Sequence, residues 1–175
     1  MRITLITGGV RSGKSRFALE RAEAAGAEDV TFIATAVLTD DEMRRRAERH
    51  RAERPAVWRT VEAATDVADA VARAQTHVIL LDCLTNLVSN AIMASESEGE
   101  EAALAAAARE VDNLLAAAAD RDGELIVVTN EVGWGVVPPY EMGRWFRDAA
   151  GQANQRVAAS AAEVYLLVAG IAMRL

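Results

Sequence analysis

Short apolar runs alternate along the chain with longer stretches in which apolar and polar residues follow a helical period. The apolar runs are nearly continuous, which is typical of parallel strands that are covered on both faces of a sheet. The strands predicted in this way are residues 3–7, 30–34, 77–81, 125–129 and 164–169, with a weaker sixth at 57–61. Strands that alternate with helical stretches indicate βαβ units, so we expect an α/β protein with a mostly parallel sheet flanked by helices.

Helical patterns fill the gaps between these strands. The predicted helices are residues 15–25, 41–54, 64–74, 84–94, 101–119 and 140–162. Gly143 and Gly151 interrupt the last pattern, so this segment is either two helices or one interrupted helix. The chain shows neither an internal repeat nor a linker, and 175 residues suit one domain with a sizeable core, so we expect a single domain over residues 1–175.

Residues 8–15 read GGVRSGKS and match the P-loop pattern G-x-x-x-x-G-K-[ST], between an expected strand and an expected helix. Glycines let backbone N–H groups surround phosphate oxygens, and the helix that follows directs its positive dipole end at them. In this motif Lys14 reaches the β- and γ-phosphates from a solvent-facing loop, and the Ser15 hydroxyl ligates Mg²⁺. The expected phosphate-binding residues are Gly8, Gly9, Val10, Arg11, Ser12, Gly13, Lys14 and Ser15. The motif predicts that the chain binds a nucleoside triphosphate.

A carboxylate, Asp82, directly follows the apolar run 78–81. In P-loop proteins an acid at the end of a strand beside the P-loop strand holds the Mg²⁺ ion, and we assign Asp82 this role. The alternative is that Asp82 caps the helix predicted at 84–94. Its neighbour Cys83 has no visible base nearby and is interpreted as a small buried packing residue.

An arginine-rich segment surrounds His50 in the helix predicted at 41–54. The arginines are Arg44, Arg45, Arg46, Arg49, Arg51 and Arg54. One interpretation is a solvated helix with Glu–Arg pairs four residues apart. The other is a nucleophilic histidine, because cationic neighbours favour the neutral imidazole, although the helix C-terminus favours the charged form. The same arginines would suit an anionic triphosphate.

The segment that follows the strand at 125–129 begins Asn130-Glu131 and continues with two glycines, Trp134 and a Pro-Pro pair. Loops at the carboxyl ends of strands line the ligand crevice of doubly wound sheets, so this segment is either a wall of the site or an ordinary long turn. His77 opens a strand and is interpreted as structural.

Charge and composition exclude several classes of protein. The net charge of −7 argues against broad binding to nucleic acid, and the single cysteine allows no intramolecular disulfide. Apolar residues make up 51% of the chain and aromatic residues only 5%, so the core must consist of Ala, Val, Leu and Ile. No signal peptide and no apolar run of membrane-spanning length is visible, so we expect a cytoplasmic protein without a membrane span.

Taken together, the motifs closely resemble those of one family, the bifunctional adenosylcobinamide kinases / adenosylcobinamide-phosphate guanylyltransferases of the cobalamin pathway. The matching segments are 8–17 (GGVRSGKSRF), 32–36 (FIATA), 41–58 (DEMRRRAERHRAERPAVW), 60–62 (TVE), 80–84 (LLDCL), 129–138 (TNEVGWGVVP) and 144–155 (RWFRDAAGQANQ). The resemblance implies a RecA-like P-loop fold and a homotrimer. It also implies two activities: phosphorylation of adenosylcobinamide by GTP or ATP with Mg²⁺, and transfer of GMP from GTP onto the resulting phosphate.

The resemblance also implies particular site residues. The histidine that becomes guanylylated falls on His50. The implied nucleotide contacts are Gly8 to Ser15, Ala34, Thr35, Ala36, Arg51, Ala52, Glu53, Arg54, Glu62 and Asp82. The chain departs from the family at residues 170–173. The family usually has Gly-x-Pro-Leu there, whereas this chain reads GIAM and has no proline.

Two rival functions stay open at this point. One is a kinase alone, with His50 a bystander on a solvated helix. The other is a nucleotide-driven switch or motor, which is disfavoured because the chain lacks an N-K-x-D guanine motif and is acidic.

Overall fold

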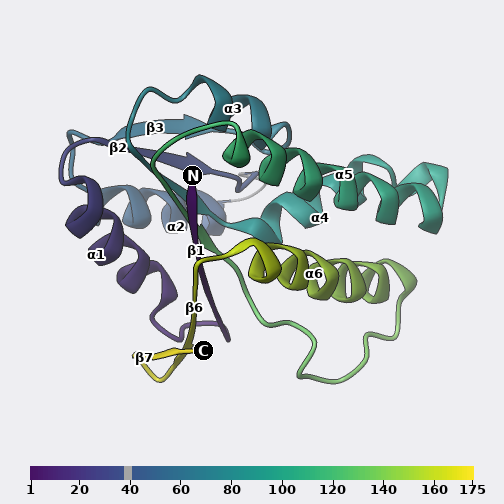
Figure 1. Cartoon of the computed structure of the whole chain (residues 1–175). Coiled ribbons are helices and arrows are strands. Elements are labelled where there is room, and N and C mark those ends of the chain that lie inside the picture. Colours follow the sequence, from purple (N-terminus) through teal and green to yellow (C-terminus); the bar gives the residue numbers. More distant parts are fainter. Residues whose placement is uncertain (38–40) are drawn as a thin grey trace.

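The computed structural model describes residues 1–37 and 41–175 (Figure 1). Within them, one sheet has the strand order β3-β2-β4-β5-β1-β6-β7. The strands are β1 (Arg2–Gly8), β2 (Val30–Ala34), β3 (Arg59–Glu62), β4 (Val78–Asp82), β5 (Glu124–Val128), β6 (Glu163–Val168) and β7 (Ile171–Arg174). All pairings are parallel except that of β6 with β7. The predicted α/β fold of the P-loop class, with its mostly parallel sheet, is confirmed.

Helices cover both faces of the sheet (Figure 1). They are α1 (Lys14–Gly26), α2 (Asp41–Ala52), α3 (Val67–Arg73), α4 (Leu84–Ala94), α5 (Glu100–Ala119) and α6 (Glu141–Ser160), with a 3-10 turn η1 (Glu96–Glu98) before α5. Helix α1 packs on one face, and α3 to α6 pack on one another and on the opposite face. No helix in the described part of the chain is long and apolar enough to cross a bilayer.

Strand burial explains the continuous apolar runs. Along β5, Leu125 and Val127 join the core under α4 to α6, whereas Ile126 and Val128 join the core under α1. The four residues Leu125 to Val128 are therefore all apolar, as parallel strands covered on both faces require. Both cores consist mainly of Ala, Val, Leu and Ile, as the composition predicts.

The sheet order corrects one expectation. Strand β4, which ends in Asp82, does not lie beside the P-loop strand β1, because β5 is inserted between them. Val128 of β5 is opposite Asp82 on one side and Ile6 on the other. Chain order does not fix which strands pair, since a crossover helix can carry the chain past a neighbour.

The C-terminal third contains two further differences. Helix α6 is one uninterrupted helix, and Gly143 permits close packing there, because an added Cβ would lie 2.5 Å from the Tyr140 ring. Strand β7 was not predicted. It forms a hairpin with β6 through Ala169 and Gly170, whose φ angles of 52° and 82° are those of a tight primed turn.

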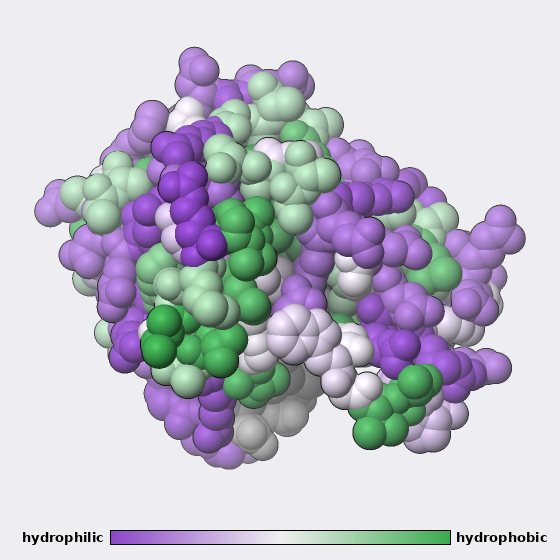
Figure 2. Space-filling model, turned by 60° about the horizontal axis from the view of Figure 1, so that its bottom comes forward, coloured by the Kyte–Doolittle hydropathy of each residue, from purple (hydrophilic) through white to green (hydrophobic). Residues whose placement is uncertain are grey.

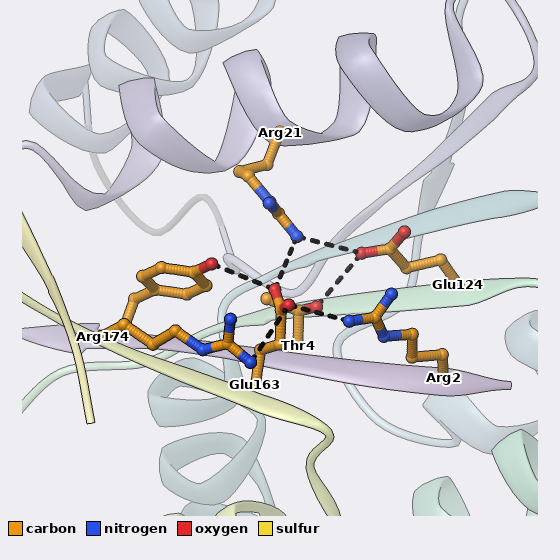
Figure 3. Close-up of polar contacts among 7 residues, drawn as sticks. Arg2, Thr4, Arg21, Glu124, Glu163 and Arg174 are labelled. Atoms are coloured by element: carbon orange, nitrogen blue, oxygen red, sulfur yellow. Dashed lines mark hydrogen bonds and ion pairs between the residues drawn. The ribbon is translucent and has the colours of Figure 1, made fainter.

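An ion cluster ties α1 to the sheet (Figure 3). The Glu163 side chain is only 9% exposed and pairs with Arg2 at 2.7 Å, Arg21 at 2.8 Å and Arg174 at 3.5 Å. The Tyr165 hydroxyl also donates to Glu163, at 3.0 Å. The cluster joins β1, β6 and β7 to the helix that begins in the P-loop, so it fixes the direction in which that helix leaves the loop.

We expect this cluster to make stability depend on pH. The hydrogen bond from Tyr165, helped by Arg174, Arg21 and Arg2, lowers the pKa of Glu163 below its ordinary 4.5 despite burial. A carboxyl group whose pKa is lower in the folded than in the unfolded state stabilises the fold at pH values above its unfolded pKa. This stabilisation is lost as the pH falls through the folded pKa. Glu163→Gln should therefore lower the melting temperature at pH 7, and the difference from the wild type should shrink below about pH 4.

Glu20→Gln is the matched control. Glu20 lies on the solvent side of α1 and pairs with Arg16 at 3.8 Å, both side chains being mostly exposed. Ion pairs between exposed side chains contribute little to the stability of the fold, so this variant should have the melting temperature of the wild type at every pH. A Glu163→Gln melting curve that matches the control would show that the cluster does not stabilise the fold.

Candidate active site

A cleft of about 810 Å³ opens at the carboxyl edge of the sheet, between the P-loop and α2. Its lining comes from the P-loop, the ends of β2, β4 and β5, and the starts of α1 and α4. The lining residues are Val10, Arg11, Ser12, Gly13, Lys14, Ser15, Arg16, Phe32, Ala34, Ala36, Ala47, Arg49, His50, Glu53, Arg54, Asp82, Cys83, Asn86, Val128 and Asn130. The cleft lies at the sheet edge where α/β proteins bind their ligands.

The P-loop backbone adopts conformations that require glycine at two positions. Gly8 has φ +148°, and a Cβ there would lie 2.4 Å from the Leu167 carbonyl oxygen. Gly13 has φ +96°, and a Cβ there would lie 3.2 Å from Gly170. The Gly170 N–H donates to the Ser12 carbonyl at 2.9 Å, so the β6–β7 turn supports the loop from behind.

Lys14 corrects a second expectation. It is not on a solvent-facing loop but is the first residue of α1 and is only 7% exposed. Its Nζ donates to the Gly9 carbonyl at 2.6 Å, because the loop folds back over the start of the helix. The Ser12 hydroxyl nearby is buried and has no hydrogen-bond partner among the described residues. A phosphate oxygen would supply one, since buried hydroxyls are nearly always paired.

Asp82 and His50 face each other across the cleft. The His50 Nδ1 lies 3.7 Å from the Asp82 Oδ2, which is too long for a hydrogen bond but close enough for an ion pair if the imidazole is protonated. The alternative role of Asp82 as a helix cap is wrong, because the N-cap residue of α4 is Cys83 and no side chain makes the cap hydrogen bond. The structure therefore brings His50 of α2 into the same cleft as the P-loop, which sequence reasoning from the residues did not establish.

Arg54 forms a cationic wall of the cleft. Its guanidinium lies over the Phe32 ring at 3.8 Å, and its Nε donates to the His50 carbonyl at 3.0 Å. Burial, and then the charge of Arg51, lower the pKa of Arg54. A phosphate group in the cleft would raise the pKa of Arg54 again, because an opposite charge favours the protonated guanidinium.

Several residues expected to contact nucleotide do not line the cleft. They are Gly8, Gly9, Thr35, Arg51, Ala52 and Glu62. Thr35 is fully buried, where its Oγ1 donates to the Cys83 carbonyl and accepts from the Cys83 N–H, both at 2.8 Å. Arg51 and Glu62 are exposed by 67% and 75% and pair with each other at 3.7 Å. The side chain of Arg46, one of the six arginines, lies outside the described part of the chain.

Several residues that line the cleft were not expected to contact nucleotide, among them Phe32 and Asn86. Phe32 reads as an ordinary core residue because it lies in a buried strand, and only its contact with Arg54 reveals a further role. Asn86 lies in the first turn of α4, the helix that begins two residues after Asp82 at the cleft. The loop after β5 contributes Asn130 to the cleft, in agreement with its interpretation as a wall.

A glycine loop between strand and helix, a buried lysine and a facing carboxylate define a P-loop nucleotide-binding protein. The model of one family, described as cobinamide kinase / cobinamide phosphate guanyltransferase, matches residues 4–175. The chain belongs to this family, which confirms the resemblance and the expected class of enzyme, a kinase and guanylyltransferase of cobalamin biosynthesis.

Curated relatives agree over nearly the whole chain. The bifunctional adenosylcobalamin biosynthesis protein CobU of Salmonella typhimurium is 42% identical, with 98% of each chain covered. CobU of Escherichia coli is 41% identical, again with 98% of each chain covered. The corresponding protein CobP of Pseudomonas aeruginosa is 40% identical over 98% of this chain and 95% of its own length. These matches disfavour a switch or motor.

The sole cysteine gives a test of the cleft that does not depend on activity. Burial, and then the charge of Asp82, raise the pKa of Cys83 to about 11. At pH 8 an alkylating reagent should therefore modify the native protein roughly two-hundredfold more slowly than a free thiol of pKa about 8.5, because only the thiolate reacts. Intact-mass measurements over time give the rate, and the same protein in urea is the control. Native alkylation as fast as in urea would contradict the buried thiol.

Proposed function

We propose that this enzyme phosphorylates adenosylcobinamide with GTP or ATP and then transfers GMP from GTP to adenosylcobinamide phosphate. The transfer passes through a guanylyl-histidine at His50 and gives adenosylcobinamide-GDP. One observation carries the proposal: His50, the P-loop and Asp82 line one cleft. Membership of the kinase and guanylyltransferase family supports the two activities, as do the bifunctional names of the relatives.

In the phosphoryl-transfer step the P-loop positions the triphosphate. Its N–H groups and the Lys14 ammonium offset the charge on the β- and γ-phosphates, so catalysis is mainly positioning and electrostatics. Ser15 and Asp82 line the same cleft, and their oxygens are the hard ligands that Mg²⁺ prefers, beside phosphate oxygens and water. These two residues would hold Mg²⁺, which supplies further charge neutralisation on the transferring group.

In the guanylyl-transfer step an imidazole nitrogen of His50 attacks the α-phosphorus of GTP, and pyrophosphate leaves. A phosphate oxygen of the substrate then attacks the same phosphorus and releases His50, so one difficult displacement becomes two easier ones. The His50 Nδ1 lies 3.7 Å from the Asp82 carboxylate, so we assign the attack on phosphorus to the other nitrogen, Nε2. Arg49 and Arg54 line the cleft and would stabilise the departing pyrophosphate.

Because both sets of residues share one cleft, we infer that one nucleotide site serves both steps in turn. The homotrimer implied by the resemblance stays a prediction. So do the cytoplasmic location and the absence of nucleic-acid binding. Apolar side chains at Ile171 and Met173 in β7, and at Leu175 just after it, are exposed and leave surface that an assembly would bury.

His50→Ala tests the covalent step. The variant should take up no label from GTP that carries the label at its α-phosphate, and it should make no adenosylcobinamide-GDP. Because the P-loop is intact, it should still accumulate adenosylcobinamide phosphate. In the wild type, the bound label should be released by acid and resist alkali, since a phosphorus–nitrogen bond is acid-labile. Gel autoradiography and product chromatography measure these outcomes.

His77→Ala is the matched control, since His77 is the only other histidine and lies just before β4, at the edge of the sheet opposite the cleft. This variant should label and turn over like the wild type. Normal labelling of His50→Ala would place the nucleophile elsewhere. Loss of the kinase step as well would show that His50 is needed for both reactions.

A further inference from the structure

Glu131 is an acidic side chain held directly beside the P-loop. It follows β5, the strand that pairs with the P-loop strand β1. Its backbone N–H donates to the Gly8 carbonyl at 3.2 Å, which continues the ladder into the P-loop. The Thr7 hydroxyl donates to its Oε1 at 2.7 Å. Both the backbone and the carboxylate of Glu131 are therefore hydrogen-bonded to Thr7 and Gly8, where β1 leads into the P-loop.

A second set of hydrogen bonds comes from helix α6. The Asn154 Nδ2 donates to the Glu131 Oε1 at 3.1 Å and to the Asn130 carbonyl at 3.1 Å. The Thr129 hydroxyl donates to the Asn154 Oδ1 at 2.7 Å, which orients the amide. These neutral donors hold one carboxylate oxygen, while Oε2 accepts no hydrogen bond from the described residues. Such a carboxylate is oriented and still able to accept a proton.

In the sequence, Glu131 comes between a residue of the cleft and an apolar loop. Its neighbour Asn130 lines the cleft. Beyond Glu131, the side chains of Trp134, Val136 and Tyr140 are exposed. Figure 2 shows apolar groups on this face of the molecule, which is the lower side of Figure 1, where the loop and β7 lie. This loop offers apolar contacts to a large, partly apolar substrate, and Glu131 joins the loop to the cleft residue Asn130.

We propose that Glu131 is the residue that accepts the proton of the substrate hydroxyl during phosphoryl transfer, an inference that rests on the proposed kinase activity. As the hydroxyl oxygen bonds to the γ-phosphorus, the bond from that phosphorus to the β-phosphate oxygen breaks and the nucleoside diphosphate leaves. The hydroxyl proton moves to the Glu131 carboxylate and is then lost to water.

The two reactions make different demands on this residue. An alcohol has to lose its proton as it attacks, so a base helps the kinase step. The phosphate that attacks in the guanylyl-transfer step is already an anion and needs no base. Glu131 should therefore matter for the first step and not for the second, whereas a residue that only shapes the P-loop would affect both.

Glu131→Gln tests the proposal while keeping the local structure. The glutamine oxygen still accepts from Thr7 and Asn154, but the amide takes up no proton. The kcat for phosphorylation should fall by about a hundredfold to ten-thousandfold with little change in KM. In the wild type, the kinase rate should fall at acid pH because the carboxylate becomes protonated and no longer acts as a base. This fall should be absent in Glu131→Gln. GMP transfer to adenosylcobinamide phosphate supplied ready-made should continue at the wild-type rate.

Glu131→Asp keeps a carboxylate. It should recover part of the kinase rate, and its kinase rate should again fall at acid pH. Glu141→Gln, at the exposed start of α6, is the control and should behave as the wild type. Normal phosphorylation by Glu131→Gln overturns the proposal, and so does equal loss of both steps in a folded variant. If Glu131→Gln does not fold, the proposal is overturned by a Glu131→Asp variant whose kinase rate does not fall at acid pH. A wild-type enzyme that makes neither product would refute the proposed function itself.

Discussion

The nucleotide site depends on the close approach of the P-loop backbone to the β6–β7 hairpin. A Cβ at Gly8 would collide with the Leu167 carbonyl oxygen, and one at Gly13 would be in tight contact with Gly170 in addition to the strain of a positive φ. The Ser12 carbonyl accepts the Gly170 N–H, so the turn and the loop are joined as well as packed. This contact sets where α1 begins, and hence where Lys14 and Ser15 lie at the floor of the cleft. The ion cluster around Glu163 then holds the rest of α1 on the sheet.

A parallel sheet collects the other groups at the same edge. Strands β1, β4 and β5 all end beside the cleft, so the P-loop, Asp82 and Asn130 meet there although they are far apart in the chain. Helix α2 adds His50 from above the edge, 3.7 Å from the carboxylate of Asp82. In the function that we propose, this arrangement lets one bound triphosphate be attacked at its γ-phosphorus by an alcohol, or at its α-phosphorus by a histidine. The choice depends on which acceptor is positioned.

Local patterns were sufficient to predict the α/β class, most strands and helices, and the P-loop, because each depends on periodicity or spacing within a few residues. They failed where distant contacts decide. The insertion of β5 beside β1, the burial of Lys14 under the Gly9 carbonyl, and the hairpin that adds β7 all depend on tertiary packing. Thr35 is a nucleotide contact only by the family resemblance, and its side chain holds the backbone of Cys83. The roles of His50 and Asp82 rest on motif and family, and the structure adds their proximity.

The central claim is that one nucleotide site, built on the P-loop, serves both reactions. Calorimetric titration with a GTP analogue that neither reaction can cleave tests it most directly, on the wild type and on Lys14→Ala. The account predicts one analogue bound per chain in the wild type. In the variant, binding should be at least about a hundredfold weaker, because the buried ammonium no longer offsets the phosphate charge. Two bound analogues per chain, or unchanged binding to Lys14→Ala, would contradict it.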